Sequence, residues 1–305
     1  MKQFFTFIFL LGTLSVFAQQ DVQYSQFIFN KLAFNPAYAG SKEAMTLAAI
    51  YRHQWQGIEG APRTFNVQAH SPFFKNRNGL GLAITSDAIA HTRSSYADLS
   101  YAYRIPFKND SKLAIGLAAR FENTRIDVNA IEVIDNLDPD VPFADGNRNT
   151  VNFGIGAYYS AQNFYIGLSA PTLLKNNLYS DDYVGARSIS RFRSYYLMAG
   201  VIAPVSQNIK FKPAMMISYA QNAPFELDLN ASFLFMDVLW LGVSYRLGDS
   251  VAGVIQYQFS KQFKAGLAVD FTTSELNSYT RGSGEIMIEY LFSYEKEGIN
   301  NIRFF

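Results

Sequence analysis

The chain has 305 residues, of which 49% are hydrophobic and 16% aromatic, with 19 Tyr, 27 Phe and only 2 Trp. It carries 26 Lys and Arg against 25 Asp and Glu, and it has no Cys. A chain so nearly neutral lacks the basic field that electrostatic binding of nucleic acid needs. The absence of Cys excludes disulfides, thiolate metal sites, Cys nucleophiles and attachment of lipid to a lipobox Cys.

The chain begins with the pattern of a secretory signal peptide. A basic residue precedes an apolar run over Phe4–Phe17, and Ala18 supplies the small residue that signal peptidase requires before its cleavage site. The run is too short to span a bilayer as a helix, and no longer apolar run follows it. We therefore predict a signal peptide over residues 1–18, cleaved between Ala18 and Gln19. The alternative is a buried N-terminal helix or strand.

Residues 44–305 alternate with a period of two. One face of each segment is apolar and the opposite face is small or polar, which is the period of a β-strand. The predicted strands are Met45–Arg52, Thr64–His70, Gly79–Thr85, Ala97–Arg104, Lys112–Glu122, Val151–Tyr159, Phe164–Leu168, Tyr195–Val201, Ile209–Tyr219, Phe225–Phe235, Leu239–Tyr245, Val251–Phe259, Phe263–Phe271 and Ile286–Phe292.

A soluble β-sandwich also alternates, so three further features decide the fold class. The segments have about the ten residues that a tilted strand needs to cross a bilayer. Tyr and Phe gather at the ends of the apolar faces, as in the aromatic girdles of membrane barrels. The opposite faces carry small and polar residues, as a lumen would. The sequence thus predicts an all-β transmembrane outer-membrane β-barrel of about 14 antiparallel strands over residues 44–305, preceded by a non-barrel segment over residues 19–43.

The connections between the predicted strands alternate in length. The longest, Asn123–Asn149 and Pro171–Arg191, follow odd-numbered strands, and every connection after an even-numbered strand is short. Outer-membrane barrels have short periplasmic turns and longer exterior loops. An even number of strands then places both termini in the periplasm. The terminal aromatic residue, Phe305, is the kind of signal that barrel-assembly machinery reads.

The polar residues do not form a pattern that indicates catalysis. His53, His70 and His91 are predicted to lie far apart, without a Ser or Asp partner at a suitable spacing, and no GxSxG, HExxH or P-loop pattern occurs. The loop Asn123–Asn149 is rich in carboxylates, which could bind Ca²⁺, but it lacks the spacing of an EF-hand and is better explained as a solvated acidic loop. We expect no enzyme activity, no cofactor and no metal site. Lumenal charges such as Arg120 are expected to form ion pairs that plug the barrel rather than a substrate track.

The segment Gln19–Ser41 is aromatic and rich in Asn, and Asn35-Pro36 is a turn signal. It shows no strand alternation. Two interpretations stay open from these residues: a plug or tether of the barrel, or a docking segment for a periplasmic partner.

The ordered motifs of the chain resemble the PorP/SprF proteins of the Bacteroidetes type IX secretion system. The resemblance spans nearly the whole chain except residues 123–191, and its specific part is the N-terminal block. The motifs that carry it are Gln23–Phe27, Asn35–Ser41, Tyr51–Trp55, Gly57–Pro62, His70–Pro72, Gly79–Leu82, Tyr101–Pro106, Ser283–Met287 and Arg303–Phe305.

The resemblance implies an outer-membrane component of type IX secretion and gliding machinery, without catalytic activity. Its partners would be secretion components or the C-terminal domain of a secreted surface protein, an adhesin in some members, and the component would assist export or anchoring or link periplasmic motor parts to the outer membrane. The candidate partner-docking residues are Tyr24, Phe27, Asn35, Pro36, Ala37, Tyr38 and Gly40, and the residues of the first strand and loop motif are Tyr51, Arg52, Trp55, Gly60 and Pro62. The competing hypotheses are a porin or FadL-like channel for small or hydrophobic solutes and, third, a barrel enzyme.

Overall fold

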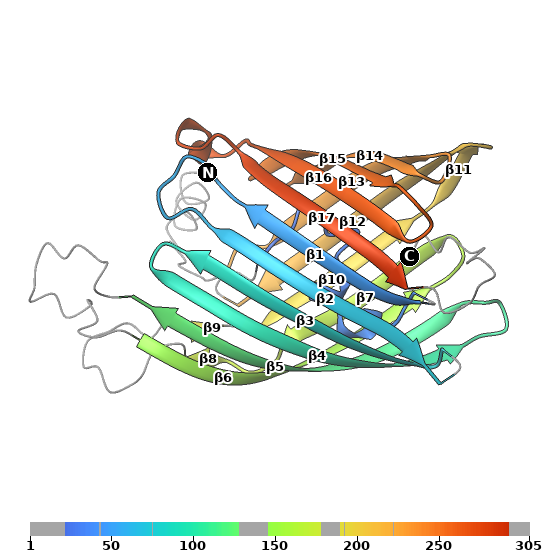
Figure 1. Cartoon of the computed structure of the whole chain (residues 1–305), viewed down its shortest axis with the longest axis horizontal. Helices are drawn as coiled ribbons and strands as arrows, with labels where there is room; N and C mark the ends of the chain where they lie inside the picture. Colours follow the sequence, from blue (N-terminus) through green and yellow to red (C-terminus); the bar gives the residue numbers. More distant parts are fainter. Residues whose placement is uncertain are drawn as a thin grey trace, which may run out of the picture.

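The computed structural model describes residues 22–42, 44–74, 76–127, 146–177, 190–191, 193–221 and 223–292. These residues form a closed antiparallel β-barrel with a segment of chain inside it (Figure 1). The strands are β1 (Met45–His53), β2 (Arg63–Phe73), β3 (Asn78–Ile89), β4 (Thr92–Pro106), β5 (Lys112–Ile126), β6 (Gly146–Ser160), β7 (Phe164–Thr172), β10 (Ser194–Val201), β11 (Ala203–Ser206), β12 (Ile209–Ala220), β13 (Glu226–Phe235), β14 (Leu239–Arg246), β15 (Ser250–Gln258), β16 (Phe263–Thr272) and β17 (Ser283–Phe292).

Strands that follow one another along the wall pair with one another, and the pairing of the first strand with the last closes the barrel. β1 pairs with β17, and β10 pairs with both β7 and β12. The short β11 continues the line of β10 along β12, so the wall has the 14 strands that the alternation predicted. A separate small pair, β8 (Asn176–Asn177) and β9 (Ser190–Arg191), lies within the connection from β7 to β10. Within the described ranges no helix has the length and apolar character needed to cross a membrane.

The two faces of the wall differ as the period of two predicted. Large apolar side chains point outward and stay exposed in the isolated chain, among them Leu82, Leu99, Leu117, Phe153, Leu168, Val243, Ile255, Leu267 and Ile286. Tyr side chains lie near both ends of this band, including Tyr51, Tyr219 and Tyr245 at one end and Tyr101, Tyr103 and Tyr257 at the other. Most inward positions are small, polar or charged and are buried, and some carry large apolar side chains, such as Ile50, Met198 and Met287, that are buried as well. Lipid is the solvent that suits such an outer face.

Several strands extend farther at the loop end than the alternation indicated. β3 continues to Ile89 and β4 begins at Thr92, so the connection expected over residues 86–94 is reduced to Ala90 and His91, and β4, β5 and β6 each have 15 residues. The expected loop 123–149 likewise loses residues at both of its ends to β5 and β6. The additional residues, such as Arg93–Ser95, are polar on both faces. Strand pairing needs only backbone hydrogen bonds, and beyond the lipid the outer face no longer has to be apolar.

Residues 22–42, which we call the plug, lie inside the barrel. The plug contains two short 3₁₀ turns, η1 (Lys31–Ala33) and η2 (Pro36–Tyr38). We call the end of the barrel that carries the connection from β1 to β2 the loop end, and the opposite end the turn end. Gln23 contacts the connection between β12 and β13 at the loop end, whereas Lys42 pairs with Glu289 toward the turn end. The plug therefore threads the lumen lengthwise.

The course of the plug bears on the prediction that both chain termini lie on the same side of the membrane. The even number of strands does place Met45 and Phe292 together at the turn end. The plug, however, carries the chain back through the lumen, so that Val22 lies in the loop-end half. The two outermost described residues thus lie at opposite ends of the barrel. The termini themselves lie outside the described residues.

Candidate functional site: the plugged lumen

The seven candidate docking residues all lie inside the barrel. Each is buried, with Tyr24 at 2%, Phe27 at 3% and Asn35 and Ala37 at 0% exposure. Most of the plug's aromatic side chains belong to one core cluster with wall residues such as Tyr158 and Met198. Docking of a partner by these side chains would therefore require the plug to leave the lumen.

The turn η2 is formed by its own sequence. The Asn35 side chain accepts a hydrogen bond from the Ala37 N–H at 2.9 Å, and Pro36 occupies the first position of the turn, where no N–H is needed. The Asn35 Nδ2 donates to the carbonyl of Ala157 in β6 at 3.0 Å, so the cap also ties the turn to the wall. The backbone then reverses at Gly40, whose φ of +63° suits glycine.

The wall that faces η2 has almost no side chains. Gly79, Ala102, Gly116, Gly156 and Ser169 are direct cross-strand partners in one row across β3, β4, β5, β6 and β7. Glycine inside a strand commonly marks the close approach of another backbone. We call this row the cradle.

The plug fills the space that the cradle leaves. A β-carbon added at Gly116 would collide with the backbone of Ala37, and one added at Gly79 would collide with the carbonyl oxygen of Ala39. The Ser169 hydroxyl donates to the Phe34 carbonyl at 2.8 Å. Wall and plug are therefore complementary in shape, and η2 is an integral part of the packed interior.

A buried ion cluster holds the plug near the loop end. Arg52 of β1 bonds to Asp270 of β16 at 2.7 Å and to Glu285 of β17 at 3.2 Å. The two oxygens of Glu285 accept the backbone N–H groups of Ser25 and Gln26, each at 3.0 Å. The Ser25 hydroxyl donates to Asp270 at 2.7 Å. All three charged side chains are at most 2% exposed. We call Arg52, Asp270 and Glu285 the latch, because they bind both the wall and the plug.

Two further arginines of the loop-end half are also paired with carboxylates. Arg120 makes two hydrogen bonds to Asp98, at 2.7 and 3.0 Å, and stacks over the Tyr96 ring at 4.1 Å. Arg246 bonds to Asp228 at 2.8 Å. The expected ion pairs are present, and they line the lumen beside the plug.

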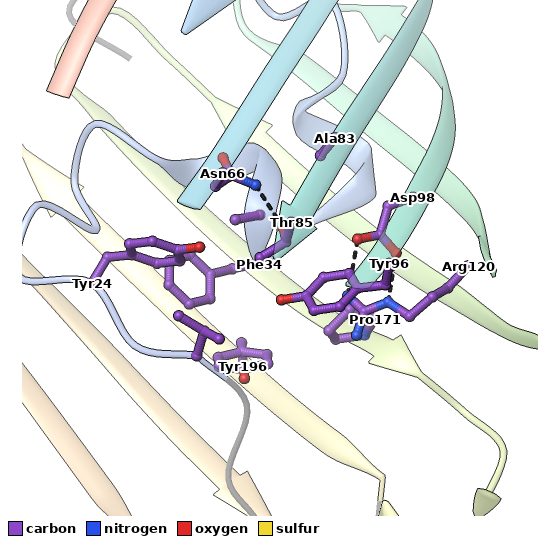
Figure 2. Close-up of a pocket in the computed structure, with 12 residues that line it drawn as sticks. Tyr24, Phe34, Asn66, Ala83, Thr85, Tyr96, Asp98, Arg120, Pro171 and Tyr196 are labelled. Carbon is purple, nitrogen blue, oxygen red and sulfur yellow. Dashed lines mark hydrogen bonds and ion pairs between the residues drawn. The ribbon is translucent and has the colours of Figure 1, made fainter. Parts of the chain in front are cut away.

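Figure 2 shows the pocket between Arg120 and the plug. The Tyr24 and Tyr96 hydroxyl groups point into it, with Phe34 and Tyr196 on one side and the hydrogen-bonded pair Asn66 and Thr85 on the other. Its volume of about 20 Å³ suits one water molecule. The Tyr24 hydroxyl and Asn66 Oδ1 line this pocket and have no hydrogen-bond partner among the described residues, so a water is the occupant that the pocket fits.

The turn-end half is rich in lysine instead. Glu289 of β17 bonds to Lys42 at 2.6 Å and to Lys264 at 3.2 Å. Lys31 of the plug lies over the Tyr165 ring at 4.0 Å. Burial lowers the pKa of Lys31 well below its usual value, and the neighbouring lysine charges lower it further. Burial also raises the pKa of Tyr38 to about 12, so its phenol stays neutral.

The residues of the first strand and loop motif serve different purposes. Tyr51 points outward and is 43% exposed, whereas its neighbour Arg52 points inward into the latch. Trp55, Gly60 and Pro62 lie in the connection from β1 to β2 at the loop end. There the Trp55 N–H donates to the Ser283 hydroxyl, and the Gly60 carbonyl accepts from the Ala90 N–H at 2.8 Å.

The three histidines lie on different elements. His70 is buried, and its Nδ1 accepts a hydrogen bond from the Gly40 N–H at 3.2 Å, so it supports the plug. His53 ends β1, and His91 lies in the turn between β3 and β4. No group of three metal-binding side chains occurs in the described part of the chain. Ala18, Gln19, Phe305 and most of the acidic loop lie outside the described residues.

Sequence reasoning missed the latch and the cradle. The alternating Gly79 and Gly81 were noted only as a motif, although glycine at inward positions of a strand indicates close backbone approach. No sequence signal places Ser25 beside Glu285, because 260 residues separate them. Such contacts depend on how the barrel closes.

Solved structures with a similar fold include a transporter, a hydrocarbon channel and a FadL homologue. The toluene transporter TbuX of Ralstonia pickettii is 12% identical with a TM-score of 0.54, covering 89% of this chain and 94% of its own. The monoaromatic hydrocarbon channel CymD is 15% identical with a TM-score of 0.51, covering 93% and 95%. A FadL homologue of Pseudomonas aeruginosa is 12% identical with a TM-score of 0.51, covering 92% and 96%. At these identities the likeness shows the fold alone.

The comparisons of sequence are more specific. No curated protein matches the chain. A family described as "Type IX secretion system membrane protein PorP/SprF" matches residues 16–290, which include the plug and nearly all of the barrel. Together with the outer-membrane barrel, this match establishes that the chain belongs to the PorP/SprF family of type IX secretion system membrane proteins.

Proposed function

We propose that this chain is a closed outer-membrane component of the type IX machinery that works by binding proteins at its two ends. It assists the export or surface anchoring of an adhesin-type secreted protein, or it links periplasmic motor components to the outer membrane. The short turns face the periplasm and the longer loops face the exterior. No step of this function requires chemistry on a substrate.

The filled lumen is the observation that supports this proposal. The plug occupies the interior from the loop end to the turn end, and it is held by the latch, the cradle and the core cluster. The pocket beside it has room for about one water molecule. A barrel filled in this way is suited to serve as a rigid platform, and its surfaces for partners are then the loops and turns.

Within this proposal, the candidate docking residues act by holding the plug in its position inside the barrel. Gln23 lies at the loop end, so the plug starts at the end of the lumen that this proposal turns to the exterior. The aromatic residues of the plug would anchor it inside the barrel. Binding by the plug side chains themselves would need the plug to be released.

Crosslinking in the outer membrane tests the role. The tagged full chain is crosslinked in cells, purified and analysed by mass spectrometry for the crosslinked residues. Crosslinks from the loops to the C-terminal domain of a large secreted protein would support export or anchoring. Crosslinks from the turns to periplasmic motor components would support the linking role. Crosslinks to neither class would contradict the proposal.

A channel for small or hydrophobic solutes is the alternative, and the fold shared with TbuX and CymD is what favours it. Conductance of the purified chain in planar bilayers separates the two hypotheses. A closed component shows no stepwise conductance, whereas a porin-like channel conducts. Because a hydrophobic solute carries no current, uptake of toluene into vesicles that contain the protein completes the test. Conductance or uptake would favour the channel.

Epitope labelling in intact cells tests the proposed orientation of the barrel in the membrane. A small epitope placed between β14 and β15, in the short connection Leu247–Asp249, marks the loop end. A second epitope at Met236–Asp237 marks the turn end. In intact cells we expect an antibody to label the first epitope and not the second. The reverse pattern would invert the proposed topology.

A further inference from the structure

Three arginines lie in one row on the outer face of the barrel at the loop end. Arg93 of β4 and Arg125 of β5 are direct cross-strand partners, and Ala88 of β3 aligns Arg63 of β2 with Arg93. All three arginine side chains are exposed. They share the alternation of the large outward side chains on their own strands, which are Phe65, Leu99 and Phe121. We call Arg63, Arg93 and Arg125 the arginine row.

The positive charge of the arginine row is not compensated by the part of the chain that the structure describes. None of the three guanidinium groups forms an ion pair or a side-chain hydrogen bond with a described residue. The β-carbons of direct cross-strand partners lie about 4.5–5.5 Å apart, and like charges placed in this way destabilise a sheet. Arg93 and Arg125 are such a pair. The lumenal Arg52 and Arg120 are, in contrast, each paired with carboxylates. The arginine row therefore offers its charge to an anion outside the chain.

The outer face changes from charged to apolar over two rows below the arginines. The next outward row toward the middle of the wall is mostly polar and consists of Phe65, Ser86, Ser95, Asn123 and Asn149. The row after it is apolar and consists of Val67, Ile84, Ala97, Phe121 and Val151. Because residues two apart in a strand are separated by about 7 Å, the arginine row lies about 13 Å along the strands from the first apolar row. If the apolar rows contact acyl chains, the arginine row lies at the level of lipid headgroups.

We infer that the outer face of β2–β5 at the loop end is a binding site for a membrane lipid with a phosphate headgroup, whose phosphate the arginine row holds. Guanidinium groups match the oxygens of phosphate in a bidentate way and always carry their charge. Arg93 and Arg125, on adjacent strands, can bind one phosphate together, and its charge would relieve their repulsion.

The three rows together select a lipid over a free ion. The apolar row provides contact for acyl chains, and the serine and asparagine side chains of the polar row can form hydrogen bonds with the glycerol or sugar part of a headgroup. Basic clusters beside a membrane surface are a known means of binding anionic lipids. This inference does not depend on the proposed role in secretion. In the proposed orientation, the lipid belongs to the exterior leaflet.

Two lipids that differ only in the phosphate group test the site. The full chain is purified in a mild detergent, depleted of lipid, and mixed with dioleoyl phosphatidic acid or with dioleoylglycerol. Native mass spectrometry then counts the lipid molecules that stay bound. We expect saturable binding of the phosphatidic acid and at least tenfold weaker binding of the dioleoylglycerol. Equal retention of the two lipids would overturn the inference, because only the apolar surface would then contribute.

Substitutions then locate the site. Arg93→Gln with Arg125→Gln should weaken the affinity for phosphatidic acid at least tenfold. Arg77→Gln with Arg281→Gln is the matched control, because these arginines are also exposed but lie in connections between strands, outside the arginine row. The affinity of this control should be unchanged. Heat-dependent mobility in a gel shows whether each variant is folded, and if the double variant does not fold, the single Arg93→Gln variant replaces it. Equal affinities of the row variant and the control would overturn the inference.

Two further measurements separate a lipid from other anionic ligands. Inorganic phosphate is added to the complex with phosphatidic acid, and a lipid site keeps its lipid in a large excess of the free ion, because the acyl chains contribute to binding. Displacement by an equal concentration of inorganic phosphate would overturn the inference in favour of a free ion. The chain is also purified from outer membranes without depletion of lipid. A phosphorylated lipid that copurifies with the wild-type chain and is reduced in the Arg93→Gln, Arg125→Gln variant supports the inference, whereas an acidic protein crosslinked to the arginine row in place of a lipid overturns it.

Discussion

The loop end and the turn end of the lumen hold the same plug by different means. Near the loop end, Arg52, Arg120 and Arg246 are each paired directly with carboxylates, and the latch also binds the plug backbone. Near the turn end, Lys42 of the plug and Lys264 of β16 share one carboxylate, that of Glu289. Arginine forms geometrically defined pairs, whereas lysine is a mobile point charge. The loop end therefore fixes the position of the plug backbone through the latch, whereas the turn end holds the plug through a lysine that shares its carboxylate with the wall.

The largest expected effect comes from breaking the latch. Arg52→Met leaves Asp270 and Glu285 buried without their cation, and loss of one partner of a buried ion cluster typically costs about 3–5 kcal/mol. Unfolding in urea, followed by gel mobility, measures this loss. The triple variant Arg52→Met, Asp270→Asn and Glu285→Gln is the control, because it removes the charges together. We expect it to recover most of the stability, and an equal loss in both variants would argue against a charge effect.

Filling the cradle should displace the plug by shape alone. Gly116→Val puts side-chain atoms where the Ala37 backbone lies, and overpacking of this kind costs about 1–3 kcal/mol. Protease sensitivity of the plug and bilayer conductance should both increase. Gly253→Val is the matched control, since a β-carbon there meets no atom within 4 Å. Equal behaviour of the two variants would show that the cradle does not hold the plug.

A lysine removed from the turn end should behave in the opposite way to Arg52. Lys212 is 3% exposed, and Lys212→Met keeps most of its aliphatic stem while it removes the cost of burying the ammonium group, so we expect a gain in unfolding free energy of about 1 kcal/mol. The same urea titration measures it. A loss as large as that of Arg52→Met would mean that the two ends do not differ as described.

The smallest expected effect is a dependence on pH through Lys31. Its pKa is lower in the docked plug than in the free segment, because burial and the charges of Lys212, Lys42 and Lys264 oppose protonation more than Glu289 favours it. The free segment therefore binds the proton more tightly, and docking weakens as the pH falls below the ordinary lysine pKa of about 10.4. We expect the unfolding midpoint to rise from pH 7 to pH 10. The rise should be smaller in Lys31→Met, and an unchanged rise would exclude Lys31 as its source.

The local pattern of the strands is sufficient to predict the barrel. Its period of two distinguishes the lipid face from the lumen face at nearly every strand, and the turn signals separate 14 segments, so the strand count and the outer-membrane class could be predicted. The N-terminal motifs also allowed the family to be predicted. The strand ends at the loop side could not be predicted, because beyond the lipid the apolar pattern ends while backbone pairing continues.

The contents of the lumen, in contrast, depend on how the chain packs in three dimensions. The plug has no periodicity, and both a plug and a docking segment were compatible with its residues. Its position follows from the register that aligns Gly79, Gly116 and Gly156 in one row, and from closure of β1 on β17, which brings Arg52 beside Glu285. Local sequence patterns report whether a side chain faces lipid or lumen, because the strand period is local. They do not report which lumenal side chains meet, since that depends on contacts between residues more than 200 positions apart.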